Sequence, residues 1–546
     1  MKIPIVVGFT GHRDIYPEDI TELKSKVREE LLKIREKSPN SNLVVLNSLA
    51  EGADQLCAEV ALDMGIPVIA VLPMDVDEYR KDFIADSLGK FNDLLGQSAE
   101  VFVTPEIETG KQKNRDYYYR QAGIYVSSHS HILIALWDGS PAKPTGCGTA
   151  EIVGFTLNTS YGNEDTIYRA MRNGAVLHIK TRRSQAEKVD GKHETKLLEK
   201  VPGFFETNLK RTDTYNKDAI LEESNKCDLI FEEGIDFSEK KVEATLSKSY
   251  SISDKLSLKY RNKYLRSMFQ LSLLAVILVL LFLFFGQTDN GIFLLLYGMV
   301  LVSMITLYMS IKRKGFQSKY LEYRVFAETI RVQYYLEILG INKNICDSLT
   351  WPNYDKNVWI RDGIAALLIG VRTKFGISPE IVKTNWIDRQ IIYHRNALEK
   401  DSAKDKLNSR ITKTMLIMSV ATFILTAILK FSNSRMFLEV IEGSEIAKII
   451  LPNRENGVKI RDVINLTMGL VSATTVFMSN YYGKLSLQRK ISDHKKMIYL
   501  YTIFQDLYEN HEMSKDRLFF ELARESVVET GDWLTYCRDQ SPSINV

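Results

Sequence analysis

The sequence predicts an α/β, Rossmann-like N-terminal domain followed by an all-α membrane region with about four transmembrane helices. Three observations predict this fold class. Short β-branched runs alternate with amphipathic stretches over residues 1–182, loops of small residues follow three of these runs, and two long uncharged stretches lie in the second half. A chain of 546 residues is also too long for a single hydrophobic core, so more than one domain is expected.

The predicted strands of the N-terminal domain are short apolar runs bounded by glycine, proline or polar residues. They cover residues 3–8, 43–47, 67–72, 131–137 and 175–179. Helices are expected over residues 17–36 and 55–64, and residues 145–151 open another. Strands that alternate with helices predict a parallel sheet with helices on both faces.

A ligand site is expected where the strands end. Sheets of this kind bind ligands outside the carboxyl ends of their strands, and helix N-termini there attract phosphate through their amides and dipole. Glycine permits close approach of a ligand to the backbone, arginine pairs with phosphate in bidentate fashion, and carboxylates accept hydrogen bonds from ribose hydroxyls. The candidate ligand-binding residues are Gly8, Thr10, Gly11, His12, Arg13, Glu51, Gly52, Asp54, Asp138, Gly146, Gly148, Thr149 and Glu151.

These residues also have structural explanations that the sequence leaves open. A glycine between strand and helix often serves only a tight turn, Arg13 is also suited to a surface ion pair, and His12 to capping or packing. The five cysteines form no C-x-x-C pair and no histidines cluster at metal spacing, so neither a disulfide framework nor a metal site is expected. No resident cofactor is expected.

The membrane region begins with a predicted helical hairpin. Residues 268–286 and 292–311 are uncharged, and each has about the 20 residues that a helix needs to cross a bilayer. Lysines and arginines flank the outer ends of the pair, while the five-residue loop between them has none. The positive-inside rule therefore places both ends, and the N-terminal domain, in the cytoplasm, which predicts a multi-pass protein of the inner membrane with cytoplasmic N- and C-terminal domains.

A second pair of spans is predicted over residues 415–429 and 463–482. The first stretch is short, with Lys413 and Lys430 placed to extend toward the headgroups, and the second is rich in hydroxyl and amide side chains. A pair of buried or interfacial helices is the alternative. The serine- and threonine-rich stretch is the candidate pore lining, although its hydroxyls also suit bonds back to their own helix.

Three further segments are expected to be helical and soluble. Residues 183–254 are charged and either complete the first domain or form a stalk, and the apolar run 363–371 is a buried helix too short to cross a membrane. Within residues 320–335, Arg324, Glu328 and Arg331 share one helical face, which predicts a solvated amphipathic helix with an i,i+4 ion pair.

Residues 5–154 resemble the SLOG family, which is Rossmann-like and related to DprA and to the LOG phosphoribohydrolases. The motifs that carry the resemblance are residues 8–13 (GFTGHR), 48–54 (SLAEGAD), 136–139 (LWDG) and 146–151 (GCGTAE). The family implies recognition of a nucleotide or NAD-derived ligand, either ADP-ribose-like or a cyclic nucleotide. Relatives occur in melastatin-type TRP channels and in bacterial antiviral sensors.

Residues 144–151 (PTGCGTAE) depart from the pattern P-G-G-x-G-T-x-x-E of the LOG enzymes. Thr145 replaces one glycine, and Glu151, the catalytic candidate if the protein is an enzyme, comes one position early. A sensor is therefore favoured over an enzyme.

Residues 255–345 and 380–540 resemble SLATT-type modules, two-helix membrane units associated with SLOG proteins, which implies a pore-forming effector. The expected domains are a nucleotide-sensing domain, a connector, a first membrane module, a helical linker and a second membrane module, over residues 1–182, 183–254, 255–345, 346–400 and 401–546. The expected partners are a nucleotide signal, the lipid bilayer and further copies of the chain, without direct nucleic-acid binding. The alternatives are a membrane-anchored hydrolase of LOG type and a scaffold that recruits a partner protein.

Overall fold

The computed structural model divides the chain into two compact units. It describes residues 2–105, 113–141, 148–157, 174–184, 193–222, 243–288, 290–341, 343–348, 354–370, 378–431, 466–474, 487–510 and 513–539. The first unit comprises residues 1–256, 322–382 and 514–535, and the second comprises 257–321, 383–513 and 536–546. The boundaries that the sequence predicts for its five domains stay predictions.

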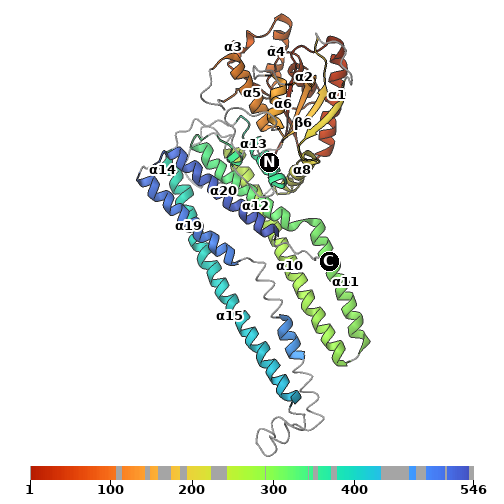
Figure 1. Ribbon diagram of the computed structural model, residues 1–546, viewed down its shortest axis with the longest axis vertical. Coiled ribbons are helices and arrows are strands. Elements are labelled where there is room, and N and C mark those ends of the chain that lie inside the picture. The colour runs from red at the N-terminus through yellow and green to blue at the C-terminus, as the bar shows by residue number, and fades with distance from the viewer. Residues whose placement is uncertain are drawn as a thin grey trace, which may run out of the picture. The chain divides into compact units, whose positions relative to one another are not determined.

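The first unit contains a seven-stranded sheet with the strand order β4-β3-β2-β1-β5-β6-β7 (Figure 1). Its strands are β1 (Ile5–Gly11), β2 (Leu43–Asn47), β3 (Val68–Leu72), β4 (Glu100–Val103), β5 (Ile132–Trp137), β6 (Ala175–Lys180) and β7 (Thr195–Glu199). The first six pair in parallel, and β7 runs antiparallel to β6. The five predicted strands and the α/β class are confirmed.

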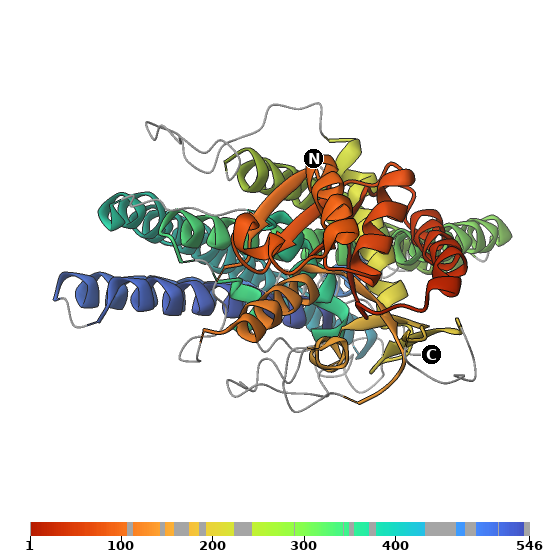
Figure 2. The same ribbon diagram turned by 90° about the horizontal axis from the view of Figure 1, so that it is seen from above.

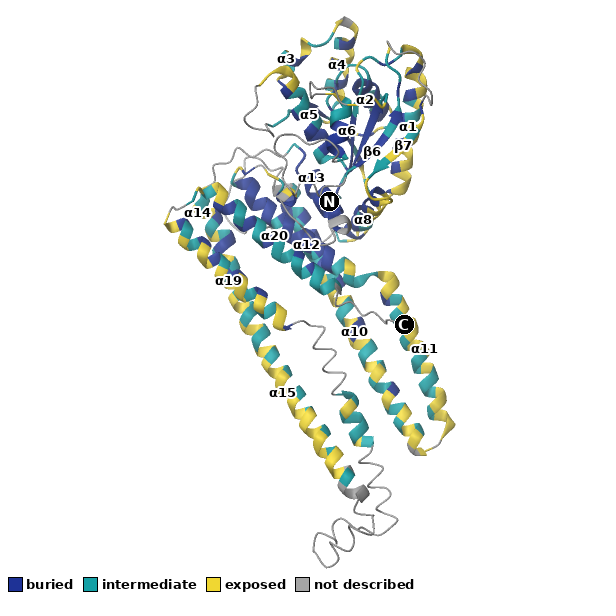
Figure 3. Cartoon of the chain, in the orientation of Figure 1, coloured by how far each residue is buried: buried dark blue, intermediate teal, exposed yellow. Residues whose placement is uncertain are grey.

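Helices cover both faces of the sheet, as predicted, and strand residues are the most buried part of the domain (Figure 3). One face packs against α1 (Ile20–Lys37), α2 (Ala53–Asp63) and α4 (Ala85–Gln97), which contribute Leu23, Leu56 and Phe91 to its core. The other face carries α5 (Arg115–His129) and α6 (Thr149–Thr156). The remaining short helices of this domain are η1 (Pro17–Asp19) and α3 (Val76–Arg80).

Residues 195–220 complete the first domain, one of the two roles expected for the connector. Strand β7 pairs with β6, and α8 (Phe204–Ile220) packs against α13 (Tyr354–Leu367). The Asn216 side chain bonds the backbone of Ile3, with its Oδ1 accepting from Ile3 N at 2.8 Å and its Nδ2 donating to Ile3 O at 2.8 Å. This pair of bonds fixes α8 beside the segment that leads into β1.

Aromatic rings pack together in the helical part of the first unit. Tyr215 of α8 contacts Phe326 of α12 (Phe316–Ile338) and Trp359 of α13, with centroid separations of 5.2 and 5.8 Å. Glu322 accepts hydrogen bonds from Arg211 Nη1 at 2.7 Å and from Trp359 Nε1 at 3.1 Å. A 3-10 turn, η3 (Ile345–Ser348), and α20 (Lys515–Asp539) also contribute residues to this unit.

The expectation of a solvated helix over residues 320–335 is wrong. The predicted i,i+4 pair is present, with Arg324 Nη2 2.5 Å from Glu328 Oε1, but Glu328 is only 9% exposed. The helix buries residues all around its circumference, including Val325, Ile330 and Gln333. Amphipathic spacing marks an apolar stripe but does not reveal that other helices also cover the polar stripe. By contrast, the predicted burial of the apolar run is confirmed for residues 364–369.

We expect Tyr215→Phe to lower the stability of the first unit by about 1 kcal/mol, because the substitution removes the buried hydrogen bond between the hydroxyls of Tyr215 and Ser253. In the structure the Tyr215 hydroxyl lies 2.7 Å from Ser253 Oγ, at the start of α10 (Lys248–Thr288). The measurement is the free energy of opening of α8 amides by hydrogen exchange. Tyr499→Phe, at a ring that is 70% exposed, is the control and is expected to change nothing. Equal protection in the two variants would contradict the assignment.

The second unit contains two helices long and apolar enough to cross a membrane. The continuous helical segments Thr245–Gly286 and Gly291–Ile338 contain windows of mean hydropathy 2.8 and 2.2, of which 11% and 0% are buried. The first includes α10 and the second includes α11 (Gly291–Lys314) and α12. Large apolar side chains of these stretches are exposed, among them Phe282 at 62% and Val302 at 64%. Exposure of this kind fits a lipid-facing hairpin rather than the core helix of a soluble protein.

The other helices of the second unit are α15 (Arg389–Phe431) and α19 (Leu487–Glu509), which lie side by side (Figures 1 and 2). Two short helices, α14 (Pro379–Val382) and η4 (Lys383–Asp388), precede α15. The predicted third span forms the end of α15, where Ile417 and Phe423 are 68% and 63% exposed. Within the described ranges only α10 and the α11 segment pass the length and hydropathy test, so two candidate spans are found rather than four. Most of the predicted fourth span lies outside the described residues, apart from helical residues 466–474.

Candidate functional site

The strand order places a topological switch point between β1 and β5. The chain passes from β1 to β2, β3 and β4 on one side, then returns to the other side of β1 to form β5. Such a reversal leaves a crevice at the carboxyl ends of the two central strands, where α/β sheets bind ligands. Gly11 at the end of β1 pairs with Leu136 near the end of β5. His12, Arg13 and Asp138 therefore lie at the edge where the sequence predicts the site.

His12 joins the loops that follow β1 and β5. Its Nε2 accepts a hydrogen bond from Asp138 N at 3.0 Å. Burial lowers the pKa of His12, against the opposing effect of the Asp138 carboxylate, and this favours the neutral ring that an accepting Nε2 requires. Asp138 Oδ1 accepts from Ser140 N at 2.9 Å. Burial opposes ionisation of Asp138, but the hydrogen bond from the Ser140 amide favours it, and the pKa of the carboxyl is lowered.

Two of the candidate glycines allow the loops after β1 and β2 to touch. Gly52 has φ +82°, and a Cβ there would lie 2.2 Å from the carbonyl oxygen of Arg13. A Cβ on Gly11 would lie 2.3 Å from Ala53 Cβ. Ala53 N donates to His12 O at 3.0 Å across this contact. At these positions the close approach that glycine permits is between two loops of the protein.

Gly8 has a packing role at the centre of the sheet. It is buried within β1, and a Cβ there would lie 2.4 Å from Ser130 Oγ and 2.9 Å from Val126 Cγ1. Helix α5 therefore crosses β1 at this point. Thr10, two residues nearer the carboxyl edge, is half-buried.

The N-terminus of α2 is partly satisfied by the protein itself. Beside the bond from Ala53 N, Gln55 N donates to Ala50 O at 3.1 Å. Asp54 is 8% exposed, and burial raises the pKa of its carboxyl to about 7, against the opposing effects of a hydrogen bond from the Ala50 backbone and of Arg13. Glu51 and Gly52 are half-buried. Asp54 therefore lies beneath this loop rather than at its surface.

The N-terminus of α6 begins directly after residues that lie outside the described ranges. Gly148 caps the helix in an extended conformation, and no described atom lies within 4 Å of a Cβ built on it. Thr149 begins the helix, and Glu151 forms an ion pair with Arg120 of α5. Gly146 and the rest of residues 142–147 lie outside the described residues. Arg120 was not among the predicted site residues, because no helix was predicted over the residues of α5.

Arg13 is an exposed side chain held against an aromatic ring. Its guanidinium carbon lies 4.9 Å from the ring centroid of Tyr119 in α5, and the Tyr119 hydroxyl donates to Asp82. Ring contact of this kind stabilises a cation and restricts its motion without neutralising its charge. Arg13 is thus a positioned cation at the switch point, and it forms no ion pair with a carboxylate in the described part of the chain.

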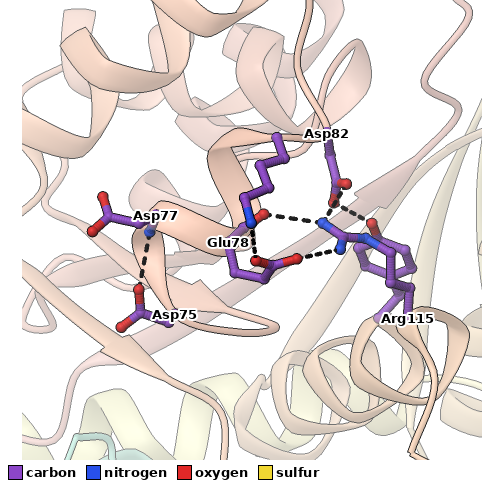
Figure 4. A network of polar contacts seen from close by, with 7 residues as sticks. Asp75, Asp77, Glu78, Asp82 and Arg115 are labelled. Carbon is purple, nitrogen blue, oxygen red and sulfur yellow. Dashed lines mark hydrogen bonds and ion pairs between the residues drawn. The ribbon is translucent and has the colours of Figure 1, made fainter.

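An ionic network fastens α3 to the start of α5 (Figure 4). Asp82 belongs to this network and also accepts from the Tyr119 hydroxyl. Arg115 Nη1 donates to Glu78 Oε1 at 2.6 Å, and Arg115 Nη2 donates to Asp82 Oδ1 at 2.6 Å. Asp75 caps α3 by accepting from Asp77 N at 3.0 Å. These residues were not predicted from the sequence, since they act as a group only after β3 and β4 bring α3 and α5 together.

The edge of the sheet thus brings together His12, Arg13, Asp138 and the N-terminus of α6, and Asp54 is buried beneath the loop after β2. Among the residues that the structure describes, no group of three histidine, cysteine or carboxylate side chains is arranged to hold a metal ion. No protein-family model matches this chain, and no curated protein matches it. The proposal of function therefore rests on the geometry of this edge and on the exposed apolar helices.

Proposed function

We propose that this protein is a ligand-gated membrane effector. The α/β domain binds a nucleotide or NAD-derived second messenger at the β1/β5 edge, and the transmembrane helices then form a pore or disrupt the membrane, in anti-phage defence. The observation that carries the proposal is the combination in one chain of Arg13 at a switch point with two exposed apolar helices.

The ligand class follows from the groups at the edge. The exposed Arg13 guanidinium suits a phosphate, and the α6 N-terminus adds backbone donors of the kind that bind anions. The ionised Asp138 carboxylate suits a ribose hydroxyl. A phosphorylated ribose, present in both cyclic nucleotides and ADP-ribose, matches these groups.

Helix α10 supports coupling between ligand and membrane. Its residues Ile252 and Leu256 are buried in the first unit, and the helix continues without a break into the apolar stretch of the hairpin. A ligand shifts the equilibrium between two arrangements of the protein only if its affinity for the two arrangements differs. Two helices do not enclose an aqueous path by themselves, so the proposed pore requires a homo-oligomer.

The test is dye leakage from liposomes that contain the full-length protein, with cyclic oligonucleotides and ADP-ribose derivatives added singly. We expect one ligand to cause leakage, and Arg13→Gln to weaken the response at least about tenfold, because a charge-assisted bond to phosphate is lost. Arg28→Gln removes an equal charge from an exposed pair with Asp63 and is expected to leave leakage unchanged. Absence of leakage with every ligand would overturn the effector proposal.

The alternative is a membrane-anchored nucleotide or NAD-glycosidic hydrolase of LOG type. It requires the Glu151 carboxylate, which the structure places in an ion pair with Arg120. Conversion of a ligand to a new product, abolished by Glu151→Gln, would identify the enzyme. Leakage without product formation would leave the effector as the function.

A further inference from the structure

Basic side chains are concentrated at one end of the α10–α11 hairpin. Residues 257–321 contain eight lysines and arginines and one acidic residue, Asp289, which lies between the two apolar stretches in the sequence. The basic residues are Lys259, Arg261, Lys263, Arg266, Lys312, Arg313, Lys314 and Lys319. The end of the hairpin away from the loop therefore carries a strong positive charge that the hairpin itself does not neutralise.

Three of these lysines surround two aromatic rings. Lys263 Nζ lies 5.4 Å from the ring centroid of Tyr260 and 5.8 Å from that of Phe316. Lys314 Nζ lies 5.9 Å from the Phe316 centroid, and Lys319 Nζ lies 4.9 Å from the Tyr260 centroid. The two rings are 6.1 Å apart. We call these five residues the basic–aromatic cluster.

Two of the lysines in the cluster, Lys263 and Lys314, have no carboxylate partner among the described residues. Lys263 and Lys314 are exposed, and neither they nor the adjacent Lys312 and Arg313 form an ion pair with any described carboxylate. The Nζ atoms of Lys263 and Lys314 both lie within 6 Å of the Phe316 ring centroid, so an anion bound beside this ring is attracted by both ammonium groups. Cation–π attraction holds the Lys263 and Lys314 side chains near the Phe316 ring.

The cluster lies at the depth of lipid headgroups if the hairpin spans the membrane. The apolar stretch 268–286 is about 28 Å long as a helix, close to the roughly 30 Å of a hydrocarbon core. Lys263 precedes that stretch by about 7 Å along the helix axis, and Lys314 follows the second apolar stretch by about 5 Å. The headgroup layer is about 5–7 Å thick, so both ammonium groups fall within it.

We propose that the basic–aromatic cluster is a binding site for the phosphate of an anionic phospholipid. The phosphate lies between the ammonium groups of Lys263 and Lys314, with the acyl chains against the exposed apolar side chains of the hairpin. Charge complementarity and continuity with the lipid-facing surface both select a lipid as occupant. The site rests on membrane insertion and is independent of the ligand that the α/β domain binds.

The test is the lipid preference of the full-length protein in liposomes of mixed phosphatidylcholine and phosphatidylglycerol, read by electron paramagnetic resonance of spin-labelled lipids. We expect wild type to prefer phosphatidylglycerol and Lys263→Gln/Lys314→Gln to reduce that preference about fivefold or more, since each basic residue near an anionic surface strengthens binding about fivefold. Lys263→Arg/Lys314→Arg keeps the charges and is expected to retain the preference. A salt concentration of about 1 M should weaken it, because the Debye length falls to about 3 Å.

The matched control is Lys24→Gln/Lys26→Gln, which removes two charges from α1 in the other unit. It is expected to keep the wild-type preference. Equal preference for both lipids in wild type, or an unchanged preference in the Lys263/Lys314 variant, would overturn the site. Loss of the preference on adding millimolar inorganic phosphate would also overturn it, by revealing a general anion site. Failure of ligand-induced leakage would leave the lipid preference intact, so the two proposals fail separately.

Discussion

Gly52→Ala is expected to destabilise the α/β domain by about 4 kcal/mol. The backbone of Gly52 has φ +82° and ψ −114°, which side-chain-bearing residues rarely adopt. The added Cβ would also lie 2.2 Å from Arg13 O and 2.6 Å from His12 O, both of which are backbone atoms. Relief of this contact must separate the loops after β1 and β2 and break the hydrogen bond from Ala53 N to His12 O.

Three other glycines separate the causes of this effect. Gly65→Ala tests a positive φ alone and should cost about 1 kcal/mol, because φ is +67° and no described atom lies within 4 Å of the new Cβ. Gly11→Ala tests the steric contact alone and should cost about 2 kcal/mol. Gly148→Ala has neither feature and should change stability by less than about 0.5 kcal/mol. The measurement is the free energy of opening of β1 and β2 amides by hydrogen exchange in the full chain.

The order of the four glycine variants by their loss of folding stability is the decisive result. If Gly52→Ala costs no more than Gly65→Ala, the two loops do not meet as described. A low cost for Gly11→Ala, with Gly52→Ala remaining costly, would locate the constraint in the backbone conformation rather than in the contact.

Asp54→Asn is expected to stabilise the protein at pH 8 by about 4 kcal/mol, because a difference of one in pKa between the folded and unfolded states corresponds to about 1.4 kcal/mol. Burial raises the pKa of Asp54 from 3.8 to about 7. Because the folded pKa is the higher one, the unfolded chain loses its proton first as the pH rises. The contribution of Asp54 to folding stability is therefore greatest below about pH 4, falls between pH 4 and pH 7, and stays low above pH 7. Asparagine has no proton to lose and keeps an acceptor for the Ala50 amide.

The measurement is urea-dependent pulse proteolysis of wild type and Asp54→Asn across pH 4 to pH 8. The advantage of the variant should grow from near zero at pH 4 to its full value at pH 8. Asp77→Asn, at a carboxylate that is 85% exposed, should give the same difference from wild type at every pH. An advantage for Asp54→Asn that is equal at pH 4 and pH 8 would show that Asp54 keeps an ordinary pKa in the folded protein.

The central strands and the apolar hairpin could be predicted from sequence because their signals are local. Strand β2 has the predicted bounds, and the other predicted strands differ from the structure by at most three residues at either end. A run of β-branched residues or an uncharged stretch of membrane length requires no knowledge of the rest of the chain. The same reasoning identified the carboxyl edge of the sheet as the place for His12, Arg13 and Asp138.

The edge strands could not be predicted in this way. Strand β4 has four residues and includes Glu100, while β7 reads TKLLE. Each pairs along one side only, so its sequence lacks the continuous apolar run of a central strand. The pairing partner, rather than the segment itself, defines these strands.

The tertiary structure decided which candidate residues face the edge of the sheet. Asp54, Glu151 and Gly8 fit a ligand-binding loop by sequence, yet the structure buries Asp54, pairs Glu151 with Arg120 and places Gly8 against α5. The sequence by itself determined the α/β class, the apolar hairpin and the loops at the carboxyl edge, because the patterns that encode them are short. Only the tertiary structure decided burial and pairing, because these depend on side chains that lie far apart in the sequence.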